Sequence, residues 1–279
     1  MMRVDLHIHT TASDGNWRPE VLVNQVKSAG IGLFAVTDHD TTANINETSA
    51  LAAAAGLNFL PGVEICTTIN NQSFHILGYG IDADNAALNK LLRYNTALME
   101  DVDQQSVKKL IKDGLAIDYD EYCQYRHNPE RGGWKALNFL IDKGFCRDIN
   151  DFFANLFTKE RGITFPDFPP PSVAIAAIKG AGGVPVLAHP GSGFHGSTLE
   201  ETLDFFVRED IQGVECYHPC HDENTTKRAV EWCKQRNLII TGGSDCHGSF
   251  FKDRCLGRPE IYLEQLNLGI LELRLPPMP

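Results

Sequence analysis

Short apolar runs alternate along the chain with longer segments in which apolar residues recur at helical spacing. The runs are rich in Val, Ile and Leu and end at Gly, Pro or Asp, which is typical of buried strands. Strands are predicted at residues 3–8, 33–37, 58–65, 74–79, 184–188, 212–217 and 238–242. Helices are predicted between most of them, at residues 18–29, 43–55, 172–181, 198–209 and 224–236. This alternation predicts an α/β fold with a parallel sheet and right-handed crossover connections.

One stretch interrupts the alternation. Residues 84–165 carry helical patterns, many charges and several aromatic side chains, and none of their segments has a convincing strand pattern. The run PDFPPPS at 166–172 then marks a rigid return to strands and helices. We therefore expect a discontinuous barrel, formed by residues 1–83 and 166–279, and a small all-helical insertion at 84–165 that caps the active site.

Histidines and carboxylates gather where the predicted strands end. Seven of the ten histidines lie on, or directly after, a predicted strand. The candidates are His7, His9, Asp14, Asp38, His39, Glu64, His75, His189, His218, Asp245 and His247. Because the carboxyl ends of the strands of a β/α barrel meet at one mouth, these side chains are expected in one pocket. So many imidazoles and carboxylates on one rim would repel or remain poorly solvated without cations, which predicts bound divalent metal ions.

Taken singly, each of these residues has a simpler interpretation. A lone histidine near a strand end is more often a hydrogen-bonded structural residue, and Asp14-Gly15 alone is a turn signal. The coincidence across all seven strands is what favours a metal site. Asp40 is interpreted differently, because it directly precedes Thr41-Thr42 and a predicted helix, so we expect it to cap that helix.

The composition narrows the class of partner. The chain has 36 acidic and 25 basic residues, a net charge of −11, so a long nucleic acid, which needs a cationic face, is not expected as a partner. A small anionic substrate is compatible, since metal ions invert the local field of an acidic pocket. No apolar run reaches the roughly 18 residues of a membrane span, and no signal peptide is apparent. These features predict a cytoplasmic protein with no membrane contact.

Six blocks of sequence, in this order, resemble the motifs of the PHP (polymerase and histidinol phosphatase) superfamily: DLHIHTTASDG, TDHDT, PGVEI, HILGYGID, VLAHPG and TGGSDCHG. The resemblance covers nearly the whole chain and is greatest to stand-alone phosphoesterases that carry a helical insertion, such as nucleoside 3′,5′-bisphosphate phosphatases. It implies a distorted (β/α)₇ barrel, three divalent metal ions and the hydrolysis of phosphate esters.

Carried onto this sequence, the resemblance assigns ligands to the three ions. His7, His9, Glu64 and Asp245 would bind the first ion; Asp14, His39 and His247 the second; and His75 and His189, with Glu64 bridging, the third. Mn²⁺ is the favoured ion, with Fe²⁺, Zn²⁺ and Mg²⁺ as alternatives. Some relatives have histidine at the position of Asp14, and we expect the harder aspartate to favour Mn²⁺, Fe²⁺ or Mg²⁺ over zinc.

The expected chemistry is in-line attack of a metal-activated hydroxide on phosphorus. Asp245 or Asp38 would orient the hydroxide, and His218 is the candidate acid for the leaving group, with an orienting or structural role as its alternative. His221 is a weaker candidate for that acid, and His127 and His195 are expected in exposed loops.

Contacts to the substrate are expected from basic residues. The segment NPERGGWKALNFLIDKG resembles the family block Arg-Pro-His followed by a helix and Gly, and in it Arg131 would contact a phosphate. Gly132-Gly133 replace the Pro-His of that block, which puts direct transfer of a relative's substrate in doubt. Lys135 and Arg18 are further candidates, with solvated surface charge as the alternative interpretation.

The favoured function is a metal-dependent phosphoesterase acting on a small phosphorylated metabolite, either a nucleotide or a sugar phosphate. The alternatives are a cyclic phosphodiesterase that opens a ribose cyclic phosphate, a histidinol phosphate phosphatase, and a PHP module without catalytic activity. The last is disfavoured because every ligand position is filled. An amidohydrolase acting on C–N bonds shares the barrel and the metals, but the order of the ligands disfavours it.

Overall fold

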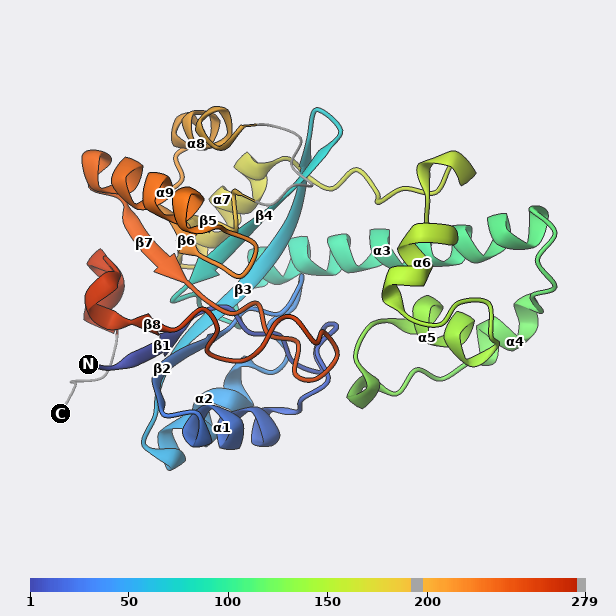
Figure 1. Cartoon of the computed structure of the whole chain (residues 1–279), viewed down its shortest axis with the longest axis horizontal. Helices are drawn as coiled ribbons and strands as arrows, with labels where there is room; N and C mark the ends of the chain where they lie inside the picture. The colour runs from blue at the N-terminus through green and yellow to red at the C-terminus, as the bar shows by residue number, and fades with distance from the viewer. Residues whose placement is uncertain (192–197, 275–279) are drawn as a thin grey trace.

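The computed structural model describes residues 1–191 and 198–274 (Figure 1). The strands are β1 (Arg3–Asp5), β2 (Ile31–Val36), β3 (Asn58–Ile69), β4 (Gln72–Tyr79), β5 (Val184–Leu187), β6 (Gly213–Tyr217), β7 (Ile239–Gly242) and β8 (Ile261–Tyr262). They form one sheet in the order β7-β6-β5-β4-β3-β2-β1-β8. The first seven correspond to the predicted strands, and the two-residue β8 was not predicted.

The sheet closes between β1 and β7. Leu6, just after β1, donates a backbone hydrogen bond to Gly242 at 3.1 Å, and His9 donates one to Cys246 at 2.8 Å. The closure brings the segments that follow the first and the last long strands side by side. The barrel that the sequence predicted is therefore confirmed, and its two most distant ligand-bearing segments are neighbours.

One strand runs against the predicted direction. The sheet was expected to be parallel, but β4 is antiparallel to both β3 and β5. Only Asn70 and Asn71 separate β3 from β4, and both have positive φ angles, 52° and 60°, as a tight hairpin requires. A parallel crossover needs a dozen or more residues. Because β4 is reversed, its first half, which includes His75, faces the mouth where the parallel strands end.

Five helices flank the barrel, and their positions agree with the sequence pattern. They are α1 (Pro19–Ser28), α2 (Ile45–Ala55), α7 (Pro171–Gly180), α8 (Leu199–Arg208) and α9 (Glu223–Arg236). In Figure 1, α1 and α2 cover one side of the sheet, and α7, α8 and α9 cover the other. Within the described parts of the chain, no helix combines the length and the apolar character needed to cross a bilayer.

The expected capping role of Asp40 is wrong. The residue before α2 is Asn44, and Asp40 is buried elsewhere with a positive φ of 49°. Its carboxylate accepts hydrogen bonds from the Cys66 backbone NH at 3.2 Å and from the Asn95 side-chain amide at 2.8 Å. Asp40 therefore ties the end of β2 to β3 and to the long helix that contains Asn95.

Helices alone are assigned between residues 84 and 165, as the sequence predicted. They are α3 (Ala86–Lys112), α4 (Tyr119–Gln124), α5 (Lys135–Asp142) and α6 (Ile149–Asn155), with short 3-10 helices at Pro129–Arg131 and Lys159–Arg161. Figure 1 shows α3 leaving the barrel and entering a lobe formed by α4, α5 and α6. Its residues Leu88 and Leu92 pack in the barrel core, whereas Val107 and Leu110 pack in the core of the lobe. The division of the chain into domains stays a prediction.

The lobe touches the mouth of the barrel through Gly132 and Gly133. Their φ angles are +74° and +70°, and the Gly133 NH donates a hydrogen bond to the Asp14 carbonyl at 2.8 Å. A Cβ atom added at Gly132 would lie 2.7 Å from Cβ of Phe250. The Pro-His of the family block is incompatible with this backbone, since proline fixes φ near −65°. The two glycines thus permit a close approach between the insertion and the loop after β7.

Candidate metal centre

The nine predicted ligands converge at the mouth of the barrel. They come from the segments after β1, β2, β5 and β7 and from the strands β3 and β4 themselves: His7, His9, Asp14, His39, Glu64, His75, His189, Asp245 and His247. Glu64 lies at their centre. Its Oε1 is 2.9 Å from His75 Nδ1 and 3.0 Å from His189 Nε2. Its Oε2 is 3.1 Å from His7 Nε2 and 3.3 Å from both His9 Nε2 and His39 Nδ1.

Three groups of these residues bring their ligand atoms within 4.8 Å of one another. The groups are His7, His9, Glu64 and Asp245; His9, Asp14, His39 and His247; and Glu64, His75 and His189. They coincide with the three sets implied by the family resemblance, and His9 joins the second as well as the first. The geometry therefore brings together every residue that the sequence singled out as a ligand, and their assignment to particular ions stays a prediction.

Burial and neighbouring charges act in opposite directions on the titration of this cluster. Burial alone would raise the pKa of Glu64, but His7, His39 and His75 outweigh it and lower that pKa well below its usual range. Burial lowers the pKa of His39 to about 3, so its imidazole is neutral, which is the form that binds a metal ion. At His7, burial is outweighed by Glu215 and Glu64, and they raise the pKa to about 10. The cluster thus keeps its central carboxylate ionised, while His7 and His39 are shifted in opposite directions.

Several buried atoms of the cluster lie near oppositely charged groups, but none of these contacts within residues 1–191 and 198–274 has the geometry of a hydrogen bond. They are both ring nitrogens of His9 and Oδ1 of Asp14. Buried polar groups without hydrogen-bond partners are uncommon in folded proteins, and a bound ion can take the place of the missing partner. Buried carboxylates packed side by side also carry a large desolvation cost unless cations compensate it. The residues present therefore fit a site for divalent metal ions.

Glu215 was missed by the sequence analysis. It lies fully buried on β6, accepts a hydrogen bond from His7 Nδ1 at 2.9 Å and one from the His189 backbone NH at 2.9 Å. The surrounding histidines outweigh burial and lower its pKa to about 2. A carboxylate behind a ligating imidazole fixes the ring so that the other nitrogen faces the ion. The available signal was a glutamate inside the apolar run QGVECY.

Cys66 is a second unexpected member of the mouth. Its Sγ lies 3.9 Å from His39 Nδ1, and the ligand atoms of His39, Cys66 and His75 lie within 4.8 Å of one another. The side chain of Cys66 is half-buried. A thiol at this position adds a soft donor beside the nitrogen and oxygen ligands.

Asp38 lies behind the cluster and supports it. Its carboxylate accepts hydrogen bonds from the Thr10 NH at 2.7 Å, the Thr10 hydroxyl at 2.6 Å and the Ser13 hydroxyl at 2.6 Å. These bonds fix the loop between His9 and Asp14. The placement differs from the expected role of Asp38 in orienting the attacking hydroxide, because both of its oxygens are engaged in holding this loop.

The two oxygens of Asp245 face different partners. Oδ1 lies 3.0 Å from His9 Nε2, within the first group of ligands. Oδ2 lies 3.2 Å from His218 Nε2, and the Arg254 guanidinium forms an ion pair with the same oxygen. His218 Nδ1 lies 3.1 Å from the Cys220 backbone nitrogen and 2.8 Å from Cys220 Sγ, so the Cys220 residue holds this side of the ring and leaves Nε2 facing Asp245. His218 thus directs Nε2 into the mouth, and its role as the acid for the leaving group stays a prediction.

The three basic residues that were expected to bind substrate have other partners. Arg131 forms two hydrogen bonds of 2.7 Å with the Asp142 carboxylate and one of 3.1 Å with the Tyr125 hydroxyl. This fork-like pairing holds the start of α5 to its end and differs from the expected phosphate contact.

Lys135 and Arg18 are also engaged away from the ligand cluster. Lys135 Nζ donates to the Cys123 carbonyl at 3.1 Å and lies 4.6 Å from the centre of the Tyr122 ring. Arg18 is exposed and forms an ion pair with Glu130, so it links the start of α1 to the insertion. Both placements agree with the alternative interpretation of these residues as surface charges.

The remaining histidines do not join the ligand groups described above. His221 binds the Cys216 carbonyl through Nδ1 at 2.9 Å and accepts a hydrogen bond from the Gly191 NH at 3.0 Å. His127 is half-buried, although it was expected to be exposed. His195 lies outside the described residues.

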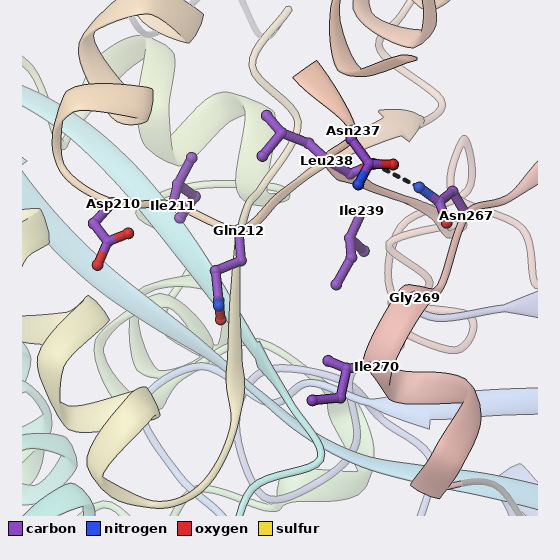
Figure 2. Close-up of a pocket in the computed structure, with 9 residues that line it drawn as sticks. All are labelled: Asp210, Ile211, Gln212, Asn237, Leu238, Ile239, Asn267, Gly269 and Ile270. Atoms are coloured by element: carbon purple, nitrogen blue, oxygen red, sulfur yellow. Dashed lines mark hydrogen bonds between the residues drawn. The ribbon is translucent and has the colours of Figure 1, made fainter. Parts of the chain in front are cut away.

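A pocket of about 410 Å³ lies at the other end of the barrel (Figure 2). It is lined by residues that precede or begin β6 and β7, such as Ile211, Gln212, Asn237 and Ile239, and by Asn267 and Gly269. Asn267 closes one side, where its side-chain amide donates to the Leu238 carbonyl at 2.9 Å. Because it lies at the amino ends of these strands, this pocket is separate from the metal centre at their carboxyl ends.

Comparison with known proteins places the chain among relatives with phosphate chemistry. A 3′,5′-nucleoside bisphosphate phosphatase from Chromobacterium violaceum is 30% identical over 263 residues, which is 93% of this chain and 92% of that protein. A 5′-3′ exoribonuclease from Escherichia coli is 30% identical over 87% of this chain and 84% of its own length. A phosphoribosyl 1,2-cyclic phosphate 1,2-diphosphodiesterase from Eggerthella lenta is 27% identical over 88% of this chain and 94% of its own.

Solved structures agree with these relationships. An amidohydrolase from Chromobacterium violaceum, solved with bound sulfate and no metal, has a TM-score of 0.83 and 29% identity, covering 98% of this chain and 97% of that chain. A candidate metal-dependent phosphoesterase from Bifidobacterium adolescentis has a TM-score of 0.79 and 28% identity, covering 91% of both chains. A family profile described as the PHP domain matches residues 5–143. The chain therefore belongs to the PHP domain family.

Proposed function

We propose that this protein is a metal-dependent phosphoesterase that hydrolyses a phosphate ester of a small phosphorylated metabolite, a nucleotide or a sugar phosphate. The observation that carries the proposal is the convergence of three ligand groups on one mouth, two of which share Glu64. The related phosphatase, exoribonuclease and cyclic phosphodiesterase all act on phosphate esters, which supports this reaction class. The net charge of −11 favours a small anionic substrate over a long nucleic acid.

The three groups of ligands would hold three divalent ions, with Mn²⁺ as the favoured metal. When bound, such ions supply Lewis acidity and lower the pKa of coordinated water toward neutrality. Glu64 would be shared between the first and the third group, and His9 between the first and the second. Asp14, as an anionic oxygen ligand in the second group, favours Mn²⁺, Fe²⁺ or Mg²⁺ over zinc.

The protein's own side chains orient the reactants and move a proton. Asp245 presents Oδ1 to the ligand groups and can orient the attacking water from there. His218 directs Nε2 toward Asp245 Oδ2 and, with both ring nitrogens protonated, would donate the Nε2 proton to the leaving oxygen and become the neutral ring. Glu215 fixes the ring of His7, and Asp38 fixes the loop that carries His9. No covalent intermediate with the enzyme is required.

A phosphate-release assay tests this proposal. The protein is purified without chelators, supplied with Mn²⁺, and offered nucleoside 3′,5′-bisphosphates, nucleoside monophosphates, ribose cyclic phosphates and histidinol phosphate. We expect phosphate release from at least one monoester, and loss of that release in the Asp245→Asn variant. Absence of hydrolysis of every phosphate ester by a protein shown to contain metal would contradict the proposal. An amide substrate in the same screen tests for the chemistry named in the Chromobacterium structure.

A cyclic phosphodiesterase is the second candidate. It is favoured by the departure of Gly132-Gly133 from the family's Pro-His block, because these glycines reshape the contact between the insertion and the mouth. The Eggerthella relative carries the name of such an activity. Opening of a ribose cyclic phosphate at a rate above that of every monoester in the same assay would select this candidate. The histidinol phosphate and non-catalytic alternatives are separate outcomes of the same screen.

A further inference from the structure

The loop that follows His247 is anchored to the barrel at both ends. The Ser249 NH donates to Asn16 Oδ1 at 2.9 Å, and the Gly257 NH donates to Asp5 Oδ2 at 2.8 Å. Asp5 is buried on β1 and also accepts a hydrogen bond from the Ser244 NH at 2.9 Å through its other oxygen. One buried carboxylate therefore holds the loop immediately before Asp245 and again after Arg254. Side chains between these anchors have a defined position relative to the mouth.

Arg254 projects from this loop toward the ligand cluster. Its guanidinium forms an ion pair with Asp245 Oδ2 and lies 5.3 Å from the centre of the Phe251 ring. Phe251 in turn packs edge-on against the imidazole of His247, with ring centres 4.8 Å apart. The side chain of Arg254 is 33% exposed, whereas Asp245 is 4% exposed. The guanidinium therefore lies at the rim, with one side toward the cluster and the other toward solvent.

The contact leaves the ligand groups intact. The first group is formed around Oδ1 of Asp245, which is 3.0 Å from His9 Nε2 and 3.5 Å from His7 Nε2. Arg254 and His218 contact the other oxygen, Oδ2. Because the two oxygens face different directions, a guanidinium at Oδ2 and a cation at Oδ1 are compatible. Arg254 and His218 together form a donor-rich edge next to the proposed metal ions.

Arg254 is also the basic residue of the described part of the chain that ion pairing places at the ligand groups. Among the ion pairs between residues 1–191 and 198–274, it is the one arginine or lysine that pairs with a carboxylate of the three ligand groups. Arg131 is paired with Asp142, and Arg18 is paired with Glu130. A phosphoryl dianion entering the mouth would meet the guanidinium of Arg254 beside His218.

We propose that Arg254 is the substrate-binding residue that holds the phosphoryl group, with its guanidinium donating hydrogen bonds to the non-bridging oxygens. Arginine suits this position because its planar, permanently charged fork matches two phosphate oxygens at once. The inference rests on the proposed phosphoesterase function and assigns its phosphate contact to the barrel loop instead of the insertion.

Three variants test the assignment: Arg254→Ala, Arg254→Lys and, as a matched control, Lys252→Ala, which removes an exposed charge from the same loop. For each we measure kcat and KM with the best substrate, binding of inorganic phosphate to the Mn²⁺-loaded protein by calorimetry, bound manganese and Tm. We expect Arg254→Ala to lower kcat/KM about 100-fold, as for removal of a donor that stabilises transition-state charge. We expect it to weaken phosphate binding about tenfold, as for a lost charged hydrogen bond.

Bound manganese and Tm should stay at the wild-type level in Arg254→Ala. Lys should restore part of the phosphate affinity, since it keeps the charge and loses the fork, and Lys252→Ala should behave as wild type. Unchanged kcat/KM and phosphate affinity in Arg254→Ala would overturn the assignment. Equal loss of manganese in the Ala and Lys variants would instead make Arg254 a support for Asp245. If the wild type hydrolyses no phosphate ester, the proposed function fails, and the calorimetric comparison still decides whether Arg254 binds phosphate.

Discussion

The barrel mouth and the helical insertion place their charged side chains in opposite ways. At the mouth, Glu64 and Glu215 are buried together among histidines. In the insertion, charged residues such as Arg131 and Asp142 pair with each other and remain about 40% exposed. Exposed pairs of this kind contribute about 0–1 kcal/mol to the free energy of unfolding, and they need no functional explanation. A group of buried carboxylates has a high desolvation cost unless cations compensate it. The charges at the mouth therefore indicate a binding site for cations, whereas those of the insertion do not.

The same contrast appears in the titration of individual carboxyl groups. Histidines around Glu64 outweigh burial and hold its pKa well below the usual range. In the insertion, Asp103 lies on α3 with few compensating charges, and burial raises its pKa to about 7. The carboxylate of Glu64 is therefore kept ionised, as a metal ligand must be, whereas the carboxyl group of Asp103 is kept neutral up to about pH 7.

The largest effect that we expect comes from removing one ligand at the mouth. His9→Asn or Asp245→Asn should lower kcat/KM by more than about 100-fold, because changes even outside the first ligand shell cost 10–100-fold. Bound manganese, measured by elemental analysis, should fall in both variants. Asp151→Asn is the matched control, since it breaks the pair between Asp151 and the exposed Arg147 in the insertion and should leave both quantities unchanged. Near-wild-type activity in the two ligand variants would contradict the claim that the charged residues of the mouth, unlike those of the insertion, are needed for catalysis.

A smaller loss is expected from Glu215→Gln. The amide keeps the volume of Glu215 but removes the charge that holds His7 Nδ1–H, which should cost about 10–100-fold in manganese affinity or kcat/KM. Titration of the metal-depleted protein with Mn²⁺ measures this change. A variant with wild-type metal affinity and activity would show that the position of His7 is fixed by packing alone.

The raised pKa of Asp103 in the insertion should make the stability of the protein depend on pH. The folded state retains the proton of Asp103 up to about pH 7, whereas the unfolded chain loses it near its ordinary value of 3.8. The folded state thus binds more protons in this interval, and this group makes the wild type less stable as the pH rises from about 4 to about 7. Asn at position 103 does not titrate. The Tm of Asp103→Asn minus the Tm of the wild type should therefore be larger at pH 8 than at pH 5. An equal difference in Tm at both pH values would contradict the proposed burial of this carboxyl.

The smallest effect is expected from Arg131→Ala. Because Arg131 is engaged with Asp142 and Tyr125, its removal should change kcat/KM by less than about twofold and the free energy of unfolding by about 0–1 kcal/mol. Steady-state kinetics and urea unfolding measure the two quantities. A loss of kcat/KM comparable to that expected for Arg254→Ala would instead support Arg131 as the residue that binds the phosphate, as the family resemblance implies.

The strands and the candidate ligands could be picked out of the sequence because both signals are local. Apolar runs mark the strands, and the candidate ligands stand at their ends, as His39 does after β2 and Asp245 after β7. The direction of β4 differs from the expectation because the Asn70-Asn71 turn joins β3 to β4 directly, with no helix between them to form a parallel crossover. The signal for that turn was the pair of asparagines, because asparagine tolerates the positive φ angles that a two-residue hairpin requires.

Other features of the site depend on contacts between distant residues. Glu215 and His7 are separated by 208 positions, and the sequence pattern gives no indication that they form a hydrogen bond. Arg131 matches a family block, but its pairing with Asp142 depends on how α5 folds back beside it. Arg254 belongs to a loop without periodicity, and its position follows from the anchors at Asn16 and Asp5. Residue types at strand ends are therefore readable from the sequence, whereas the partners of individual charges are not.

Crystals grown with Mn²⁺ and measured at the manganese absorption edge test the central claim most directly. We expect anomalous difference peaks within coordination distance of Glu64, with one between His7, His9 and Asp245, one near Asp14 and His247, and one between His75 and His189. Well-ordered side chains at the mouth with no anomalous peak among them would contradict the presence of a metal centre.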